Sequence, residues 1–510
     1  MTDGASYNVV VVGAGNAGMC AALAAREKGA NVLVLEKAPI EARGGNTFFT
    51  GGAYRFPYEG LEDIRQLIPD LSDAEAATVD VGSYPEARFR EDLMRVSEGK
   101  ADAELVETLV THAHPTMLWM QELGMRFILL YGRQAFREGG VHRFWGGLVV
   151  EAIGGGPGIC ERQFELAEAS GVEVRYECGA TGLLLGPRGL VPPLAPREPQ
   201  GERAGALRIT GVRVDGRAGP EEIACRAVVL ACGGFEANAE MRRQHLGPGW
   251  EEARVRGTEH NTGEGIRMAL AAGAAPYGDW AGCHAVAWDL NAPPTGNRRI
   301  GDLYQKHSYP LGIIVNAKGE RFVDEGADFR NYTYAKYGRE ILRQPHRAAF
   351  QLFDSKVTHL LRDEYRIREA THATSETVEG LAEALGLDRE GLGRTVEAYN
   401  AAVQPGEFDP ARLDGKATEG IDPPKSNWAL PLDAPPYTGY AVTCGITFTF
   451  GGLRVDRRAR VLDGDARPIP GLYAAGELVG GLFYENYAGG SGLMAGSVFG
   501  RIAGEGAAGE

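Results

Sequence analysis

The chain has 510 residues, of which 44% are hydrophobic and 24% are charged, and its formal net charge at neutral pH is −15. This length predicts two or three domains with large cores, and the composition is ordinary for a globular protein. The net negative charge excludes nucleic acid as the main partner, because binding phosphates needs a basic face. The seven cysteines are scattered and form no CxxC pattern, which indicates reduced intracellular thiols and no metal site.

The first predicted element is a buried strand at residues 9–12, which leads directly into the glycine turn Gly13–Gly18. A helix follows, and then a second apolar strand at 32–35 ends on Glu36, which stands 18 residues after Gly18. In such a turn the first glycine permits the tight bend, the second lets the backbone approach a pyrophosphate, and the third lets the helix pack on the strand. The helix N-terminus attracts phosphate, and the acidic residue is placed to bind a ribose hydroxyl. The segment therefore predicts a dinucleotide site.

No basic segment precedes the first strand, and no apolar run approaches the roughly 18 residues needed to span a bilayer. We therefore expect no signal peptide, no direct insertion into a membrane and a cytoplasmic location.

The next elements are polar loops and helices. The loops 43–47 and 50–52 are rich in glycine and offer backbone donors to an anion. Residues 61–100 are charged and predicted helical, and 101–128 have apolar residues at helical spacing. A helix at 158–170 and a strand at 172–176 form a further αβ step.

A Pro-, Gly- and Arg-rich stretch at 186–205 predicts an exposed loop. Strands at 207–214 and 222–225 are then predicted to form a small antiparallel pair. The buried strand at 227–234 should join the parallel sheet beside the first strand. Residues 280–446 contain more proline and more aromatic and polar clusters than the rest of the chain, which predicts a second domain inserted into the first. The last part returns to the opening pattern, with a strand at 471–477 and a helix at 491–507.

The order of these motifs resembles that of flavoproteins of the fumarate reductase/succinate dehydrogenase type. The motifs are Gly13–Gly18, Glu36, Arg43–Thr47, Gly233–Phe235, Thr262–Gly265 and Gly471–Glu477. Within that superfamily the chain is most similar to the tricarballylate dehydrogenase branch. The resemblance implies an α/β fold: a Rossmann-type (GR2-like) FAD-binding domain formed by residues 1–279 and 447–510, with an inserted α+β capping domain at 280–446.

The resemblance also assigns a set of FAD-binding residues. In it the glycines hold the pyrophosphate, Glu36 the adenosine ribose, Ala180 the adenine, Glu477 the ribityl chain, and Ser491–Leu493 a helix N-terminus beside the flavin. The full set is Gly13, Ala14, Gly15, Asn16, Ala17, Gly18, Glu36, Lys37, Gly44, Gly45, Asn46, Thr47, Gly51, Gly52, Ala180, Cys232, Gly233, Gly234, Gly476, Glu477, Ser491, Gly492 and Leu493. Respiratory members attach FAD through a His in the Asn46 loop, and no His lies between residues 36 and 60. We therefore expect non-covalent FAD.

Two catalytic candidates match the family by position. Arg330 follows the run 321–325 and corresponds to the proton-carrying Arg, one residue further along than in the fumarate reductases. Arginine is normally a fixed cation, so the alternative is that Arg330 only binds a carboxylate. His284, in the segment 280–284, matches a carboxylate-binding His.

Three positions depart from the fumarate reductase pattern. Thr447 stands in place of a second substrate His, Tyr487 in place of a carboxylate-binding Arg, and the segment 304–308 in place of the Thr-Glu and Arg proton relay. A phenol does not reproduce a bidentate Arg contact. Lys306 and His307, with the Arg pair at 298–299, supply cations for a larger polycarboxylate in one interpretation, and form a solvated loop in the other.

The sequence thus predicts an FAD-dependent enzyme that oxidises a CH–CH bond next to a carboxylate, in tricarballylate or a similar acid. The alternatives are an enoate reductase, a ketosteroid-like desaturase, for which Tyr487 would hold a carbonyl, and a catalytically silent flavin-binding subunit. Since the chain has no haem or iron–sulfur ligand pattern, we expect a separate electron acceptor: an iron–sulfur or membrane protein, a quinone or another acceptor.

Overall fold

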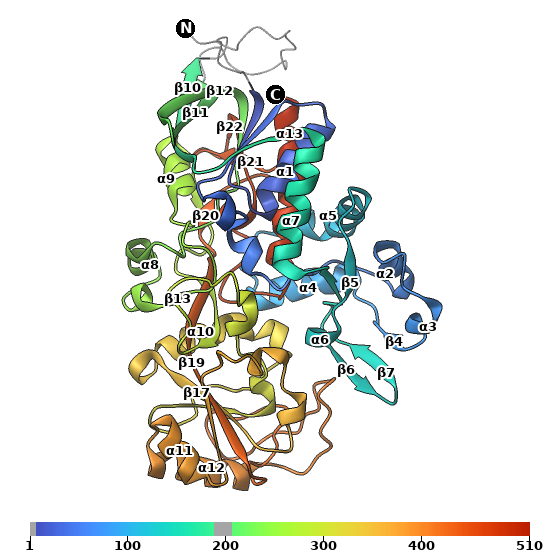
Figure 1. Ribbon diagram of the computed structural model, residues 1–510, viewed down its shortest axis with the longest axis vertical. Helices are drawn as coiled ribbons and strands as arrows, with labels where there is room; N and C mark the ends of the chain where they lie inside the picture. Colours follow the sequence, from blue (N-terminus) through green and yellow to red (C-terminus); the bar gives the residue numbers. More distant parts are fainter. Residues whose placement is uncertain (1–6, 188–206) are drawn as a thin grey trace.

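The computed structural model describes residues 7–187 and 207–510. Residues 188–205 of the predicted exposed loop lie outside the described residues. The molecule is elongated, with one sheet and its helices in the upper half of Figure 1 and a second sheet in the lower half. The upper part contains both the first and the last described elements.

The upper sheet has the strand order β10-β11-β12-β1-β2-β9, and β22 pairs with β12. Its strands are β1 (Tyr7–Val12), β2 (Val32–Leu35), β9 (Glu173–Arg175), β10 (Gly179–Pro187), β11 (Leu207–Gly216), β12 (Gly219–Leu230), β21 (Arg460–Leu462) and β22 (Pro468–Ala474). The central strands are parallel, with Val10 opposite Leu33 on one side and Val228 on the other. Parallel strands covered on both faces are continuously apolar, which is why the valine and leucine runs form the centre.

Helices from distant parts of the chain pack on this sheet or on the helices that cover it. They are α1 (Asn16–Glu27), α5 (Ala103–Glu122), α7 (Gly155–Ser170), α9 (Glu264–Ala271) and α13 (Ser491–Ala508). Helix α13 packs directly along α1, and α7 also contacts α1 (Figure 1). The two backbones approach closely because α13 carries glycines at the contact: a Cβ at Gly504 would lie 2.1 Å from the carbonyl oxygen of Ala21.

The segment 61–100 is helical only in part. It contains α2 (Leu61–Leu67), α3 (Asp73–Ala76), β4 (Val79–Asp80) and α4 (Glu86–Val96). Two small sheets border it, one of β3 (Ala53–Tyr54), β5 (Phe127–Leu129) and β8 (Val150–Ala152), the other of β4, β6 (Ala135–Glu138) and β7 (Val141–Phe144), with α6 (Tyr131–Gln134) before β6. The buried guanidinium of Arg55 ties this region together, since it donates to Tyr84, Tyr332 and the carbonyl oxygen of Gly146.

The lower sheet belongs to the capping domain and is mainly antiparallel. It consists of β13 (Arg254–Val255), β15 (Cys283–Asp289), β16 (Ile313–Asn316), β17 (Ala349–Phe353), β18 (His372–Ser375) and β19 (Tyr437–Thr449). Helices α10 (Tyr334–Leu342), α11 (Val378–Leu385) and α12 (Arg389–Ala402) accompany it. Helix α8 (Ala239–His245) and the β14 (Pro276–Tyr277) and β20 (Gly452–Leu453) pair lie between the two halves. The α/β fold with a capping domain is thus confirmed.

The domain boundaries stay a prediction. Strand β19 runs across the predicted change at 446/447, and β13, from the first segment, pairs with it. Within the described ranges, no helix is both long enough and apolar enough to cross a membrane.

Replacing Gly504 by Ala should lower the free energy of unfolding by about 1–3 kcal/mol, since the new methyl group would overlap the α1 backbone. The matched control is Gly393→Ala in α12, where a Cβ would meet nothing within 4 Å. There the better helix propensity should stabilise the protein by about 0.5–1 kcal/mol. Thermal unfolding of the two variants measures the difference, and a stabilised Gly504→Ala protein would contradict the packing described here.

Candidate active site

A long pocket begins at the glycine turn after β1 and extends to the capping domain. Most residues that the resemblance assigned to FAD line it: Gly13, Ala14, Gly15, Asn16, Ala17, Glu36, Lys37, Gly45, Asn46, Thr47, Gly51, Ala180, Cys232, Gly233, Gly476, Glu477, Gly492 and Leu493. Gly18, Gly44, Gly52, Gly234 and Ser491 do not line it. Gly18 lies behind the wall, where a Cβ would come within 2.0 Å of the carbonyl oxygen of Gly13. This is the close packing of helix and strand that the sequence predicts for the third glycine.

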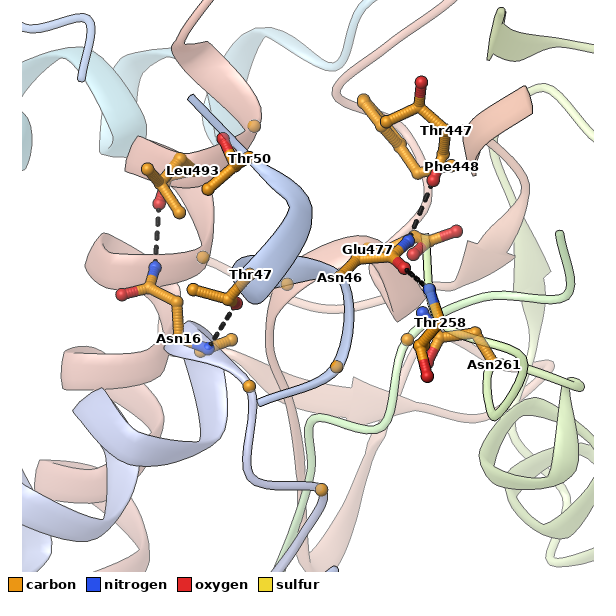
Figure 2. Close-up of a pocket in the computed structure, with 18 of the residues that line it drawn as sticks. Asn16, Asn46, Thr47, Thr50, Thr258, Asn261, Thr447, Phe448, Glu477 and Leu493 are labelled. Carbon is orange, nitrogen blue, oxygen red and sulfur yellow. Dashed lines mark hydrogen bonds between the residues drawn. The ribbon is translucent and has the colours of Figure 1, made fainter. Parts of the chain in front are cut away.

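The nucleotide end of the pocket is held rigid by hydrogen bonds to the turn. The buried carboxylate of Glu36 accepts from the backbone N–H groups of Ala14 (3.0 Å) and Ala38 (2.8 Å). Figure 2 shows Asn16, whose backbone N–H donates to Thr47 Oγ1 (2.8 Å) and whose side-chain amide donates to the carbonyl oxygen of Leu493 (3.1 Å). These bonds place the N-terminus of α1 beside the polar loop and the start of α13.

A pair of glutamates, the buried Glu236 and the half-buried Glu477, lies further along the pocket. Asn46 Nδ2 donates to Glu236 Oε1 (2.6 Å) and to the carbonyl oxygen of Thr447 (2.8 Å). Glu477 Oε1 accepts from the backbone N–H of Thr449 (2.8 Å). Burial, and then repulsion from Glu477, raise the pKa of Glu236 well above its ordinary value, and burial also raises the pKa of Glu477. The two carboxyls therefore retain a proton between them at pH values where isolated carboxyls are ionised.

The opposite end of the pocket carries three arginines and one aspartate. Asp302 bridges two of them: its Oδ2 accepts from Arg133 Nη1 (2.8 Å) and its Oδ1 from Arg256 Nε (2.8 Å). Arg256 Nη1 also donates to Thr447 Oγ1 (3.0 Å). Arg330 instead donates to neutral oxygens, through Nη2 to the carbonyl of Arg133 (3.0 Å) and the side chain of Gln134 (2.8 Å), and its buried Nε has no partner. This end therefore has an excess of positive charge.

Aromatic rings surround the predicted histidine at the same end. The ring of His284 lies 4.8 Å from that of Tyr487, 4.9 Å from that of Tyr334 and 5.2 Å from that of Phe448. Burial, and then repulsion from Arg256, lower the pKa of His284 well below its ordinary value, so the imidazole is neutral. Its Nδ1 has no partner.

Tyr487 links this cluster to α13. Its hydroxyl oxygen accepts from the backbone N–H of Gly492 (2.9 Å), at the first turn of the helix. This contact places the phenol at the helix N-terminus, where an incoming oxygen atom meets both an O–H donor and the positive end of the helix dipole.

The structure does not bring Lys306 into the pocket. Its ammonium is completely buried, lies 3.7 Å from Asp289 and donates to the carbonyl oxygens of residues 303–305. A lysine held in this way is a structural ion pair rather than a free cation for substrate. Arg298 lies 3.4 Å over the ring of Phe48, and Arg299 pairs with Glu369 at the surface. The solvated-loop interpretation fits Arg299 alone.

His307 also lies outside this pocket but faces a neighbouring cavity that Arg330 lines as well. Thr447 lines the pocket as predicted and supports Arg256. Sequence reasoning missed Arg133, Glu236, Arg256, Asp302 and Tyr334. Only Glu236 had a nearby signal, since it directly follows the Gly233–Phe235 motif.

Comparison with known proteins agrees with this geometry. A family described as an FAD binding domain matches residues 8–493. The chain is 30% identical to a probable fumarate reductase, Ifc3, of Shewanella frigidimarina, with 98% of this chain and 74% of that protein covered. It is 28% identical to a urocanate reductase of Eggerthella lenta, with 98% and 74% covered. The chain belongs to this FAD-binding family.

Solved structures confirm the fold of this FAD-binding protein. An open flavocytochrome c3 fumarate reductase has a TM-score of 0.69 at 28% identity, with 99% of this chain and 78% of that chain covered. A 3-ketosteroid Δ1-dehydrogenase of Sterolibacterium denitrificans has a TM-score of 0.73 at 22% identity, with 99% of each chain covered, which shows the fold alone. The chain is thus an FAD-dependent oxidoreductase that acts on C=C or CH–CH bonds. None of these relatives is named a tricarballylate dehydrogenase, so that finer assignment is a proposal.

The residues present fit FAD. Gly13 adopts φ 100°, and a Cβ there would lie 2.5 Å from the carbonyl oxygen of Ala231. A Cβ at Gly45 would meet no protein atom within 4 Å, so bare backbone borders the pocket at that point. The N-termini of α1 and α13 both border the pocket, so it offers positive helix ends to a pyrophosphate and to a reduced flavin.

Changing Glu236 to Gln should stabilise the protein, and the gain should grow with pH. A carboxyl with a raised folded-state pKa binds its proton more tightly in the folded protein, so wild-type stability falls as pH rises from about 4.5 through that raised pKa. Each unit of the shift corresponds to about 1.4 kcal/mol. Thermal unfolding at pH 5 and pH 8 measures the gain, which should be larger at pH 8 because the wild-type carboxyl is destabilised there and the amide does not titrate.

The control is Glu240→Gln, which removes an exposed carboxyl from α8. An equal gain at pH 5 and pH 8 for Glu236→Gln would contradict the shared proton.

Proposed function

We propose that this protein dehydrogenates a CH–CH bond next to a carboxylate in a polycarboxylate of the tricarballylate type. The observation that carries the proposal is the set of three guanidiniums, Arg133, Arg256 and Arg330, around one carboxylate at the capping-domain end of the pocket. An excess of buried cations needs anions for compensation, and arginine binds carboxylates through two parallel hydrogen bonds. When bound, FAD supplies the two-electron chemistry.

In this proposal each group has a distinct task. Arg256 and Arg133, fixed by Asp302, bind one substrate carboxylate. The neutral His284 donates an N–H to a second carboxylate, and the hydroxyl of Tyr487 holds a further oxygen beside the backbone N–H of Gly492. Charge that develops on the carbon between the reacting atoms and the carboxylate is thereby stabilised by preorganised donors.

Arg330 is proposed as the group that moves the proton. When FAD is bound, one substrate carbon gives up a hydride to it, while the neighbouring carbon loses its proton to Arg330, which has to be in its neutral form to accept it. Burial lowers the pKa of Arg330 from its ordinary value, and its Nε has no partner, so a nitrogen is left for the transfer. Reduction of the corresponding enoate uses the same residues in the opposite direction, with Arg330 giving the proton.

Two further points belong to the proposal. Electrons are exchanged with a separate protein or quinone, as in other flavoproteins of this family, and the cytoplasmic location remains an expectation from the sequence.

A substrate panel and one variant test this function. Anaerobic mixing with tricarballylate should bleach the flavin absorbance faster than succinate or a neutral 3-ketosteroid does. Arg330→Gln should lower kcat by roughly 10²–10⁴-fold with a smaller change in KM, which is the range for loss of a proton-transfer group. Arg299→Gln, which removes a surface arginine paired with Glu369, is the matched control.

The FAD content of each variant should equal that of the wild type. Near wild-type kcat in Arg330→Gln would remove its proposed role. Faster bleaching by the ketosteroid than by any acid would reject the carboxylate assignment and favour Tyr487 as a carbonyl-binding residue.

FAD attachment is proposed to be non-covalent, so denaturation with acid should leave all yellow colour in the supernatant. His260 and Cys232 both line the pocket and are side chains able to form a covalent link. Peptide mapping of the precipitate checks them, and a flavin-bearing peptide that contains either residue would contradict the proposal.

A further inference from the structure

A second cavity of about 340 Å³ lies on the other side of Arg330 from the glycine turn. Its walls come from the β6–β7 hairpin with residues 131, 132 and 145 beside it, and from the capping domain at residues 307–311, 329–330, 359–366, 410 and 428. Figure 1 shows the hairpin extending on the right of the molecule, beside the capping domain. Arg330 lines both this cavity and the flavin pocket, so its side chain stands between them.

Buried polar atoms without partners gather around this second cavity. They are both ring nitrogens of His307, Nε of Arg330 and the indole nitrogen of Trp145, and all three residues line it. His307 is only 1% exposed. A buried polar group without a partner costs about 1–3 kcal/mol, so several such groups around one cavity indicate a polar ligand.

The charge of the cavity wall specifies an anion. In the described part of the chain, neither Arg330 nor Arg362 has a carboxylate oxygen within 4 Å, and the guanidinium of Arg362 makes one long bond of 3.4 Å to the carbonyl of Gly132. Burial, and then repulsion from Arg330, lower the pKa of Arg362 to about 9. Glu364 is buried nearby and raises the pKa of both arginines, although its carboxylate lies more than 4 Å from either guanidinium. An anion between the two guanidiniums would relieve their repulsion.

The remaining wall is aromatic. The ring of Trp145 stacks on Phe329 at 4.8 Å with an angle of 15° between the planes, and on Phe136 at 6.4 Å with an angle of 16°. Trp428 continues the wall, 6.0 Å from Phe329 and tilted by 45°. Aromatic rings attract one another in edge-to-face as well as offset-stacked arrangements, so this wall favours an aromatic group in the ligand.

We propose that this cavity is a second ligand site, separate from the flavin pocket, which binds an aromatic carboxylate. Its carboxylate lies between Arg330 and Arg362 and accepts an N–H from His307, and its ring lies against Trp145. The site does not depend on which acid the flavin oxidises.

Titration of the FAD-loaded protein with benzoate tests the proposal by calorimetry. Benzoate should bind with one site per chain and leave the visible flavin spectrum unchanged, whereas benzamide, which lacks the charge, should bind at least tenfold more weakly. Arg362→Gln should weaken benzoate binding by roughly 10- to 100-fold, the range for loss of a charge-assisted hydrogen bond. Arg368→Gln, an exposed neighbour that does not line the cavity, should bind like the wild type.

FAD content and thermal unfolding show whether Arg362→Gln is folded. If it is not, Trp145→Leu decides, because loss of the stacking surface should also weaken benzoate binding about tenfold. Equal affinity in wild type and variant, or no binding at millimolar benzoate, would overturn the proposal. So would a change in the flavin spectrum reversed by tricarballylate, since benzoate would then occupy the flavin pocket, and so would tighter binding of tricarballylate at the Arg362-dependent site. Failure of the proposed dehydrogenase would appear only in turnover.

Discussion

The close approach of Gly18 to the carbonyl of Gly13 is the contact on which the rest of the site depends. With no side chain at either position, α1 begins directly at the end of β1 and points its free N–H groups into the pocket. The same close packing continues on the other face of α1, where Gly500 and Gly504 let α13 lie against it. The N-terminus of α13 is therefore placed by α1, and with it the N–H of Gly492 that meets Tyr487. One steric constraint thus positions both helix ends that border the pocket.

Burial of charge organises the opposite end. Asp302 neutralises about one of the two guanidiniums that it bridges, and no comparable carboxylate contacts Arg330 in the described chain. Removing charged groups from water costs several kcal/mol per ion, so an uncompensated arrangement persists only where the surrounding fold imposes it. Here the fold holds Arg330 through hydrogen bonds to two neutral oxygens, the backbone carbonyl of Arg133 and the side-chain amide of Gln134. An excess positive charge retained in this way is available to an anionic ligand.

The sequence predicts the parts of this protein that depend on local pattern. The glycine turn, the apolar strands and the terminal helix form as expected because glycine conformation and apolar burial act over a few residues. The polar contacts of the site do not follow from local pattern. Arg133, Arg256 and Asp302 come from three separate segments that meet only through the packing of the capping domain, and no spacing along the chain indicates it. Lys306 shows the same limit in the opposite direction, because a residue predicted to face substrate is instead buried. Its partner Asp289 comes from another segment of the capping domain, so the local sequence does not indicate this ion pair.

The departures from the fumarate reductase pattern gain a physical meaning from these contacts. Where that pattern has a His, Thr447 supports Arg256, and where it has an Arg, Tyr487 joins a wall of aromatic rings with Phe448. Positive charge and neutral donors thereby meet at the same end of the pocket, where the three arginines stand beside the hydroxyl of Tyr487 and the neutral imidazole of His284. In the proposed function, this pocket orients an acid with its carboxylate on the arginines and its reacting carbons between them and the aromatic wall. Specificity then depends on which oxygen-bearing group of the substrate reaches Tyr487, because a phenol accommodates a carboxylate or a carbonyl and the arginine it replaces favours the carboxylate.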